Sequence, residues 1–359
     1  MPRIHGPLTE KKPEERIYPV FLPHAGCPFR CVYCNQNAVT TPCGPSDSGT
    51  ARDILRIVRL KLDRLTADAR RCGIAGEISF YGGTFTSLPT AVLRQILDTV
   101  SIPIGEGIFS GIRFSTRPDA LAESRLELLS GYPVRTVELG VQSLSETVLE
   151  RIRRGYGVKA VERACAAVRA RGWRLGLQLM PGLPGDSCEV FQESLRRAIG
   201  LGPDFVRLYP TLVLKDTTLA DWYRAGSYRP LSLEEAVRWC ARAYAALREA
   251  HVPTARMGLH ADPELEKPGV VLAGPYHPAF GYLVKSRYRR DRILELVRFE
   301  PEGARTARLT AVVNDRIRSE VLGPSRENVE FIEAELGLER FNVRAEKNRD
   351  ENRIDLLWD

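Results

Sequence analysis

Residues 17–34 read IYPVFLPHAGCPFRCVYC, an apolar run that leads directly into three closely spaced cysteines. The apolar part, residues 17–22, has the length and composition of a buried strand. Cys27, Cys31 and Cys34 have the spacing C-x3-C-x2-C and follow the strand immediately. Because loops at the ends of strands often carry functional groups, this stretch indicates both the fold class and the position of a site.

The alternation that begins with this strand continues along the chain. Strands are expected at 17–22, 77–82, 111–115, 136–141, 174–180 and 204–210, and helices at 49–71, 88–99, 119–129, 145–153, 158–171, 187–200 and 232–249. Strands that alternate with helices form a parallel sheet covered by those helices. Six such units are too few for a full eight-stranded barrel. The sequence therefore predicts an α/β fold, a partial (β/α)6 TIM-like barrel, with its chemistry at the carboxyl ends of the strands.

The alternation stops near residue 250. Residues 274–281 (GPYHPAFG) have the composition of an irregular loop, 308–315 that of a strand, and 326–336 that of a helix. We therefore expect an N-terminal tail at 1–14, a barrel domain at 15–250, and a small α+β C-terminal extension at 251–359.

The composition is that of a folded globular protein, with 43% hydrophobic and 27% charged residues. No apolar run approaches the roughly 20 residues that a membrane-spanning helix needs. The first residues contain no apolar segment like that of a signal peptide. We therefore expect a cytoplasmic protein that does not engage a membrane.

The net charge of +7 is unevenly distributed, with a basic run at residues 285–292 (KSRYRRDR). This run places an aromatic residue, Tyr288, among cations, as in a phosphate-binding surface that also stacks bases, which would suit RNA. The same run is typical of a solvated helix face on which arginines pair with acids such as Asp291 and Glu295. The sequence leaves both alternatives open.

The three clustered cysteines suit an iron–sulfur cluster, because thiolates are the ligands that such clusters need. Three cysteines on a cluster of four irons leave one iron without a protein ligand, and an open position is where a cofactor can bind. A structural zinc site is the alternative, with His24 as the nearby candidate for a fourth ligand. Cys165 and Cys240 lie in apolar helical stretches and are expected to be buried thiols.

With Tyr33 before the last cysteine, the motif resembles the signature of radical S-adenosylmethionine enzymes. The resemblance implies a [4Fe–4S] cluster on Cys27, Cys31 and Cys34, with S-adenosylmethionine on the open iron. Reductive cleavage of S-adenosylmethionine would then give a 5′-deoxyadenosyl radical, with electrons from a donor such as flavodoxin or ferredoxin. The resemblance also implies contacts with this cofactor near the strand ends, by Tyr33, Gly82, Gly83, Thr84, Ser115, Arg117, Gln142 and Met180.

The order of the motifs resembles one branch more closely. They are FLPHAGCPFRCVYCNQ (21–36), GGTFTSL (82–88), STRPD (115–119), VELGVQS (137–143), QLMPGLPGD (178–186) and LYPTLVL (208–214). Together they resemble the radical domain of the elongator catalytic subunit, which modifies tRNA, and less closely the oxygen-independent coproporphyrinogen oxidases. The resemblance covers roughly residues 15–250 and implies RNA or tRNA as a partner.

Two features depart from the elongator pattern. Ser115 stands where that pattern has an acidic residue, which affects the contact with the cofactor's ribose. The chain ends at Asp359, which leaves no room for the acetyltransferase domain of that subunit, so we do not expect acetyl transfer.

Several roles stay open at this point. Arg117 either binds the cofactor carboxylate or closes an ion pair with Asp119 or Glu138. Candidate catalytic residues are Tyr209 at the end of the sixth strand, and Tyr276 and His277 in the extension. The alternatives to radical chemistry on RNA are radical chemistry on a small molecule, such as a porphyrin or metabolite, and a non-catalytic iron–sulfur or zinc protein in assembly. The sequence does not indicate an oligomeric state.

Overall fold

The computed structural model describes residues 16–22, 27, 30–35, 50–259, 263, 265–300 and 306–358. The expected tail at 1–14 lies outside these residues. The chain forms two compact units. One comprises the described residues of Met1–Arg30, Gln36–Gly140 and Lys159–Gly176, and the other those of Cys31–Asn35, Val141–Val158 and Leu177–Asp359.

A seven-stranded sheet with the order β1-β2-β3-β4-β5-β6-β8 forms the frame of the fold. These strands are β1 (Arg16–Phe21), β2 (Gly76–Tyr81), β3 (Gly111–Thr116), β4 (Val134–Gln142), β5 (Arg174–Leu179), β6 (Phe205–Leu208) and β8 (Thr254–Met257). The pairs β1–β2, β2–β3, β3–β4 and β6–β8 are parallel. The predicted α/β partial TIM-like barrel is therefore confirmed, with one strand more than expected.

The additional strand, β8, was not predicted from the sequence. Its residues, TARM, contain little of the apolar signal that marks a buried strand, and Pro253 precedes them. β8 is an edge strand, and Val206 and Leu208 of β6 are opposite Thr254 and Met257. Pairing with β6 therefore stabilises an extended conformation of residues 254–257 that the local sequence does not predict.

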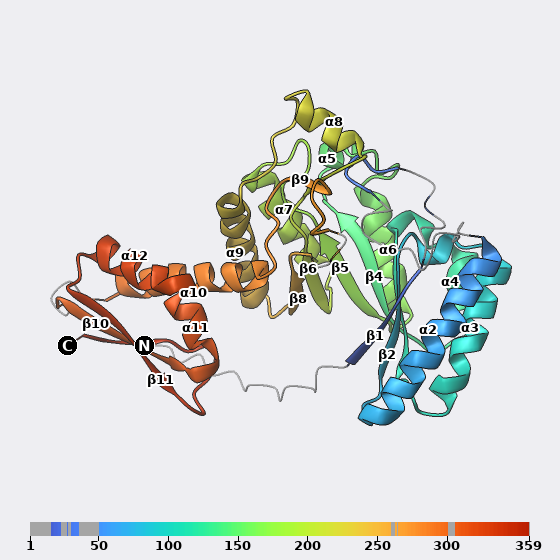
Figure 1. Ribbon diagram of the computed structural model, residues 1–359, viewed down its shortest axis with the longest axis horizontal. Helices are drawn as coiled ribbons and strands as arrows, with labels where there is room; N and C mark the ends of the chain where they lie inside the picture. The colour runs from blue at the N-terminus through green and yellow to red at the C-terminus, as the bar shows by residue number, and fades with distance from the viewer. Residues whose placement is uncertain are drawn as a thin grey trace. The chain divides into compact units, whose positions relative to one another are not determined.

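In the first unit, α2 (Ala51–Cys72) and α3 (Thr90–Gly105) pack side by side next to the first strands (Figure 1). Thr50 caps α2 by accepting a hydrogen bond from the amide of Asp53. Gly73 ends it with a φ of 64°, which glycine adopts without strain. The buried positions of α2 recur at helical spacing and are Ile54, Ile57, Val58, Leu62 and Ala69.

The strands of the first unit bury apolar residues on one face and a charged network on the other. On the charged face, Arg113 Nε lies 2.5 Å from Glu138 Oε1, and Arg113 Nη1 lies 3.3 Å from Glu77 Oε2. Tyr81 donates its hydroxyl proton to Glu138 at 3.0 Å. Because burial of an unpaired charge costs several kcal/mol, these pairings are what allow charges inside the sheet.

The helices that follow β4 are α5 (Glu146–Arg151), α6 (Val158–Ala170), α7 (Cys188–Gly200), α8 (Thr218–Arg224) and α9 (Leu233–Glu249). α9 begins at a capping box: Ser232 accepts from the amide of Glu235, whose carboxylate accepts from the amide of Ser232. α8 was not predicted, because its seven residues are too short to show a helical period. Two short strands, β7 (Val213–Leu214) and β9 (Val271–Ala273), pair antiparallel.

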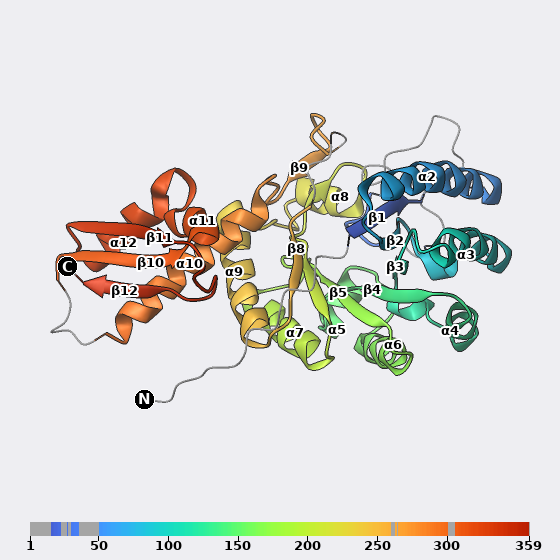
Figure 2. The same cartoon turned by 90° about the horizontal axis from the view of Figure 1, so that it is seen from below.

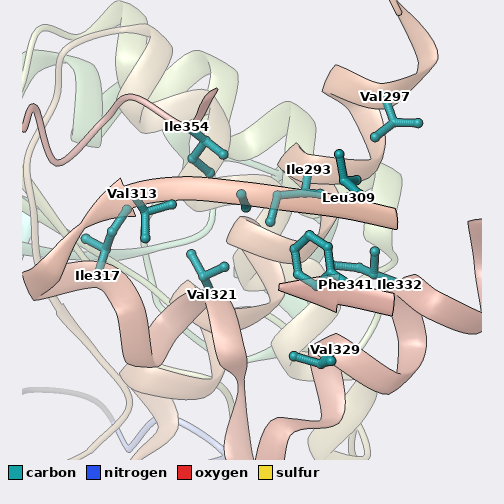
Figure 3. Close-up of a cluster of buried hydrophobic side chains, with 11 residues drawn as sticks. Ile293, Val297, Leu309, Val313, Ile317, Val321, Val329, Ile332, Phe341 and Ile354 are labelled. Carbon is teal, nitrogen blue, oxygen red and sulfur yellow. The ribbon is translucent and has the colours of Figure 1, made fainter. Parts of the chain in front are cut away.

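The C-terminal part of the second unit is a small α+β arrangement with its own core (Figure 3). Its sheet has the order β11-β10-β12, with β10 (Arg308–Asn314) parallel to β11 (Arg340–Glu346) and antiparallel to β12 (Asp355–Trp358). The helices α10 (Phe280–Arg298), α11 (Arg318–Leu322) and α12 (Glu327–Leu336) cover one face of it (Figure 2). Leu309, Ala311 and Val313 of β10 meet Phe341 and Ile332 in this core.

The expected strand at 308–315 and helix at 326–336 are confirmed by β10 and α12. None of the described helices is long and apolar enough to cross a membrane.

Candidate functional site

The second and third cysteines lie on a tight turn that backbone hydrogen bonds anchor in the second unit. The amide of Cys34 donates to the carbonyl of Cys31 at 3.1 Å. Between them, Val32 is fully buried, donates to the carbonyl of Ile152 at 3.3 Å and accepts from the amide of Leu219 at 2.8 Å. The ends of α5 and α8 therefore hold the turn that presents Cys31 and Cys34.

A buried arginine, Arg154, contacts this turn. Its Nη1 donates to the Cys31 sulfur at 3.2 Å, and its Nε and Nη2 donate to the Tyr156 hydroxyl at 2.9 and 2.7 Å. Only 5% of Arg154 is exposed. Arginine is always charged, so this contact places a fixed positive charge beside a candidate ligand sulfur.

Sequence reasoning missed Arg154. It stands in the run RIRRGYG with Arg151 and Arg153, and nothing in the local pattern separates the three. In the structure Arg151 and Arg153 are exposed, whereas Arg154 is buried. Only tertiary placement distinguishes them.

Tyr33 lies between the two cysteines of the turn and is half-buried. It packs against a small apolar cluster of Val213, Leu219 and Ala220. Burial raises the pKa of its hydroxyl well above the ordinary value of tyrosine, so the hydroxyl is protonated at neutral pH. Its described neighbours are thus structural, and its predicted contact with a cofactor stays a prediction.

The first cysteine and the glycine motif meet in the first unit. Cys27 Sγ lies 3.0 Å from Oγ1 of Thr84, a side chain that is fully buried. Gly82 and Gly83 have φ values of 98° and 60°. A Cβ on Gly82 would lie 2.3 Å from the carbonyl oxygen of Leu22, so only glycine allows this close approach between the ends of β1 and β2. The cysteine motif and the glycine motif, both predicted from the sequence, are therefore in contact in the first unit.

At the end of β3, Arg117 forms the ion pair that the sequence left as one alternative. Its Nε and Nη2 donate to the two carboxylate oxygens of Asp119, each at 2.9 Å. Arg117 is 4% exposed, but the Asp119 side chain is 23% exposed, so this bidentate pair is only partly shielded from water. Ser115, two residues earlier, is half-buried on the same strand. The pair holds Arg117 in this loop, and its predicted contact with the cofactor carboxylate stays a prediction.

In the second unit, a hydrogen bond between the side chains of Gln142 and Gln178 links the carboxyl ends of β4 and β5. Gln178 Nε2 donates to Gln142 Oε1 at 3.1 Å, and the amide of Met180 donates to the Gln142 carbonyl at 2.9 Å. Gln142 has a φ of 70°, a strained conformation for a residue with a side chain. Such strain is tolerated where the surrounding structure requires it, and often at functional sites. Gln142 and Met180 are thus adjacent, and their predicted contacts with the cofactor stay predictions.

The loop that follows Met180 contains a buried carboxyl group. Asp186 accepts hydrogen bonds from the amides of Gly182 at 3.0 Å and Ser187 at 3.1 Å. Burial raises the pKa of Asp186 to about 7, although these hydrogen bonds oppose the shift. The sequence indicated only a Pro/Gly loop here and did not single out this residue.

The three candidate catalytic residues have separate hydrogen-bond partners in the described structure. The Tyr209 hydroxyl accepts from Arg207 Nη1 at 3.1 Å, and Tyr276 donates to Glu266 at 3.1 Å. His277 Nδ1 accepts from the amide of Ala279 at 3.0 Å, which is the structural role expected of a loop histidine. The catalytic assignment of Tyr209, Tyr276 and His277 stays a prediction.

The donor set fits an iron–sulfur cluster by its chemistry. Cys27, Cys31 and Cys34 supply three sulfur groups, the ligand type that iron–sulfur clusters need, and the Cys31 sulfur accepts a hydrogen bond from the buried Arg154. Within the described part of the chain, no three Cys, His, Asp or Glu side chains are close enough together to hold a metal ion. The alternative zinc ligand, His24, lies outside the described residues.

The basic run lies on α10, and its cations are paired. Arg287 binds Asp291 at 2.8 Å, and Arg292 binds Glu295 at 2.6 Å. Arg289 is 3% exposed and binds Glu320 at 3.1 Å. Tyr288 packs edge-on against Tyr244, with ring centroids 5.1 Å apart. The cations of this run therefore have acidic partners on α10 and α11, and the expected RNA contact through the basic extension stays a prediction.

Comparison with known proteins gives the class to which these features belong. Residues 21–198 match the family model of the Radical SAM superfamily, and residues 203–290 match its Radical SAM C-terminal domain. The chain belongs to the radical SAM superfamily and is an enzyme. Members of this superfamily use a [4Fe–4S] cluster and S-adenosylmethionine.

Within that class, the chain is similar to proteins named for tRNA modification. It is 28% identical to the tRNA uridine(34) acetyltransferase of Dehalococcoides mccartyi over 232 residues, which cover 57% of this chain and 50% of that protein. It is 30% identical to Elongator complex protein 3 of Homo sapiens, over 46% of this chain and 34% of that protein. The chain thus spans half or less of the length of these relatives.

A solved structure shares the fold. The archaeal Elp3 of Methanocaldococcus infernus superposes with a TM-score of 0.54 and 23% identity, over 67% of this chain and 59% of that one. This likeness agrees with the partial barrel described above.

Proposed function

We propose that this enzyme binds a [4Fe–4S] cluster through Cys27, Cys31 and Cys34, cleaves S-adenosylmethionine reductively, and uses the radical to modify tRNA. The family match over residues 21–198 is the observation that carries the proposal. When bound, the cluster and S-adenosylmethionine supply an electron and a 5′-deoxyadenosyl radical. The residues of this chain hold, orient and shield those groups.

The contacts of the cysteine loop support this assignment. Arg154 keeps the Cys31 sulfur beside a fixed positive charge, and Thr84 links Cys27 to the glycine motif. Gly82 allows the Leu22 carbonyl to approach the end of β2, and Gly83 has a φ of 60°. On this proposal the backbone of this motif receives the amino group of the cofactor. Gln142, Gln178 and Met180 provide polar and apolar surface at the ends of β4 and β5. On this proposal they contact the nucleoside part of the cofactor.

The tRNA part of the proposal is supported by the names and the sequence likeness of the relatives. Because tRNA modification takes place where tRNA functions, we infer a cytoplasmic enzyme. Because the proposed cleavage of S-adenosylmethionine is reductive, we also infer an electron donor of the flavodoxin or ferredoxin type. The acetyl transfer named for one relative is not part of the proposal.

A first test addresses the substrate. Reconstituted enzyme with S-adenosylmethionine and dithionite should release severalfold more 5′-deoxyadenosine when unmodified tRNA is present, because a bound substrate draws the radical forward. The control is the same tRNA digested to nucleosides. Equal yields with intact and digested tRNA would exclude a polynucleotide substrate and favour a small molecule.

A second test addresses Arg154. In Arg154→Gln the cluster should still form, but its reduction potential should fall by on the order of 100 mV, because a charged hydrogen bond to a ligand sulfur stabilises the reduced cluster. A redox titration followed by electron paramagnetic resonance measures the change. Arg153→Gln is the matched control, since Arg153 is adjacent and exposed. Arg154→Lys should restore part of the potential, and an unchanged potential in Arg154→Gln would contradict the assigned role.

A further inference from the structure

The helix α2 carries more than half of the net charge of the chain. Its 22 residues include seven basic and three acidic side chains, a net charge of +4, whereas the whole chain has a net charge of +7. Such an excess on one helix produces a local positive potential, which attracts polyanions. The charge of α2 therefore calls for a partner.

The cations of α2 lie on the side of the helix that faces away from the protein. Arg52, Arg56 and Arg59 recur at spacings of four and three residues, so they form one row about 10.5 Å long. All three are exposed, and so is Arg64 beside the row. The opposite face of α2 packs against α3 and the edge strand β1 (Figure 2) and buries Ile54, Ile57, Val58, Leu62 and Ala69.

The last arginines of α2 take up the acids at that end of the helix. Arg70 Nη2 lies 3.2 Å from Glu106 Oε2, and Arg71 Nη2 lies 2.7 Å from Asp68 Oδ1. These acids are therefore engaged away from the row.

Few acids are left for the row itself. Asp53 belongs to the N-terminal cap of α2, where its carboxylate accepts a hydroxyl proton at 2.6 Å. Asp63 is exposed on the same side of the helix as the row. Within the described part of the chain, no acid forms an ion pair with Arg52, Arg59 or Arg64. The positive charge of this face is thus not neutralised by the protein.

The chemistry of the face suits the phosphates of a nucleic acid. A guanidinium matches the oxygens of a phosphate in geometry as well as charge, and a row of them can follow a regularly charged backbone. A basic helix that binds a membrane inserts its apolar face into the lipid. In α2 that face is buried against α3 and β1, so only the charged side is available.

We propose that the exposed face of α2, with Arg52, Arg59 and Arg64, binds the phosphate backbone of the RNA substrate. The inference rests on the proposed function, because it takes tRNA as the substrate. Contacts with phosphates release counterions and supply affinity without reading the base sequence. The arginines of α2 therefore hold the tRNA and take no part in the chemistry.

The experiment measures binding of unmodified tRNA to the reconstituted, unreduced enzyme at several potassium chloride concentrations. Arg52→Gln and Arg59→Gln should each lower the slope of log K against log salt by about 0.7 to 0.9, which corresponds to about five- to eightfold weaker binding at 0.1 M salt. The double variant should lower the slope by about twice as much. Arg196→Gln removes the same charge from an exposed arginine of α7 that is paired with Glu193, and should leave the slope unchanged.

A variant with the opposite effect guards against damage to the fold. Asp63→Asn removes the acid beside the row and should tighten tRNA binding, a gain that misfolding does not produce. Glutamine is a good helix former, so the arginine variants should keep α2 intact. Formation of 5′-deoxyadenosine without tRNA should be equal in all of them and in the parent. A folded double variant with an unchanged salt slope overturns the proposal.

Other outcomes separate this surface from the proposed function. If tRNA binding depends on the arginines of α2 but no 5′-deoxyadenosine forms, the proposed function fails and the surface stands. If the parent enzyme cleaves S-adenosylmethionine but does not bind tRNA, the surface is overturned while the cofactor chemistry stands. If the double variant loses binding to phosphatidylserine vesicles and keeps its affinity for tRNA, the face belongs to a lipid surface and the proposal is also overturned.

Discussion

Replacing Cys27, Cys31 and Cys34 together by alanine should remove all cluster iron from anaerobically purified protein. The parent should bind about four iron and four sulfide per chain and absorb broadly near 400 nm, as thiolate-bound cubanes do. Without the three thiolates the cluster loses its protein ligands, so its iron should be lost with them. Iron and sulfide analysis of the triple variant measures the loss.

Two other cysteines serve as controls. Cys165 and Cys240 are 1% and 0% exposed, and burial raises the pKa of the Cys165 thiol to about 12 and that of Cys240 higher still. Such thiols stay protonated and cannot ligate metal. Cys165→Ala and Cys240→Ala should therefore retain the full iron content. Zinc in place of iron after anaerobic preparation, or iron retained by the triple variant, would contradict the assignment.

Gly83→Val should weaken S-adenosylmethionine binding and leave the cluster in place. Gly83 has a φ of 60°, and valine pays about 1–3 kcal/mol to adopt it, equivalent to roughly 5- to 150-fold in affinity if binding requires this conformation. Gly82→Val should act more strongly still, because its Cβ would lie 2.3 Å from the Leu22 carbonyl oxygen. Equilibrium binding to the reconstituted protein measures the affinity.

Gly107→Val is the matched control for these glycines. Gly107 has a φ of 75°, a Cβ there would meet nothing within 4 Å, and the residue is exposed beyond the end of α3. This variant should lose a similar amount of stability with no change in cofactor affinity. If Gly83→Val binds S-adenosylmethionine like the parent, the glycine motif does not hold the cofactor.

The barrel could be predicted from the sequence because its signals are local and repeat. Apolar runs such as 77–82 and 136–141 mark buried strands, and the helices between them show a clear helical period, as α2 does. β8 and α8 were not predicted, because short elements carry little periodic signal in the sequence. The basic run at 285–292 remained ambiguous because residue types do not show which acids pair with the arginines. The structure supplies those partners.

The site could be predicted in part for the same reason. Cys27 and Thr84 are in motifs that follow strands, and the fold brings strand ends together. Arg154 lies in no motif and matters through its neighbour, a cysteine sulfur. The division of the chain at residue 250 stays a prediction, as do the roles of Tyr276 and His277. Such roles depend on contacts between distant segments, which a local pattern does not contain.

The most direct test of the account is whether the protein cleaves S-adenosylmethionine. The enzyme is reconstituted anaerobically with iron and sulfide, then incubated with S-adenosylmethionine and dithionite, and 5′-deoxyadenosine and methionine are quantified. The account predicts equal amounts of both products, none without dithionite, and none from the triple cysteine variant. Absence of 5′-deoxyadenosine from fully reconstituted parent protein, with and without tRNA, would contradict it.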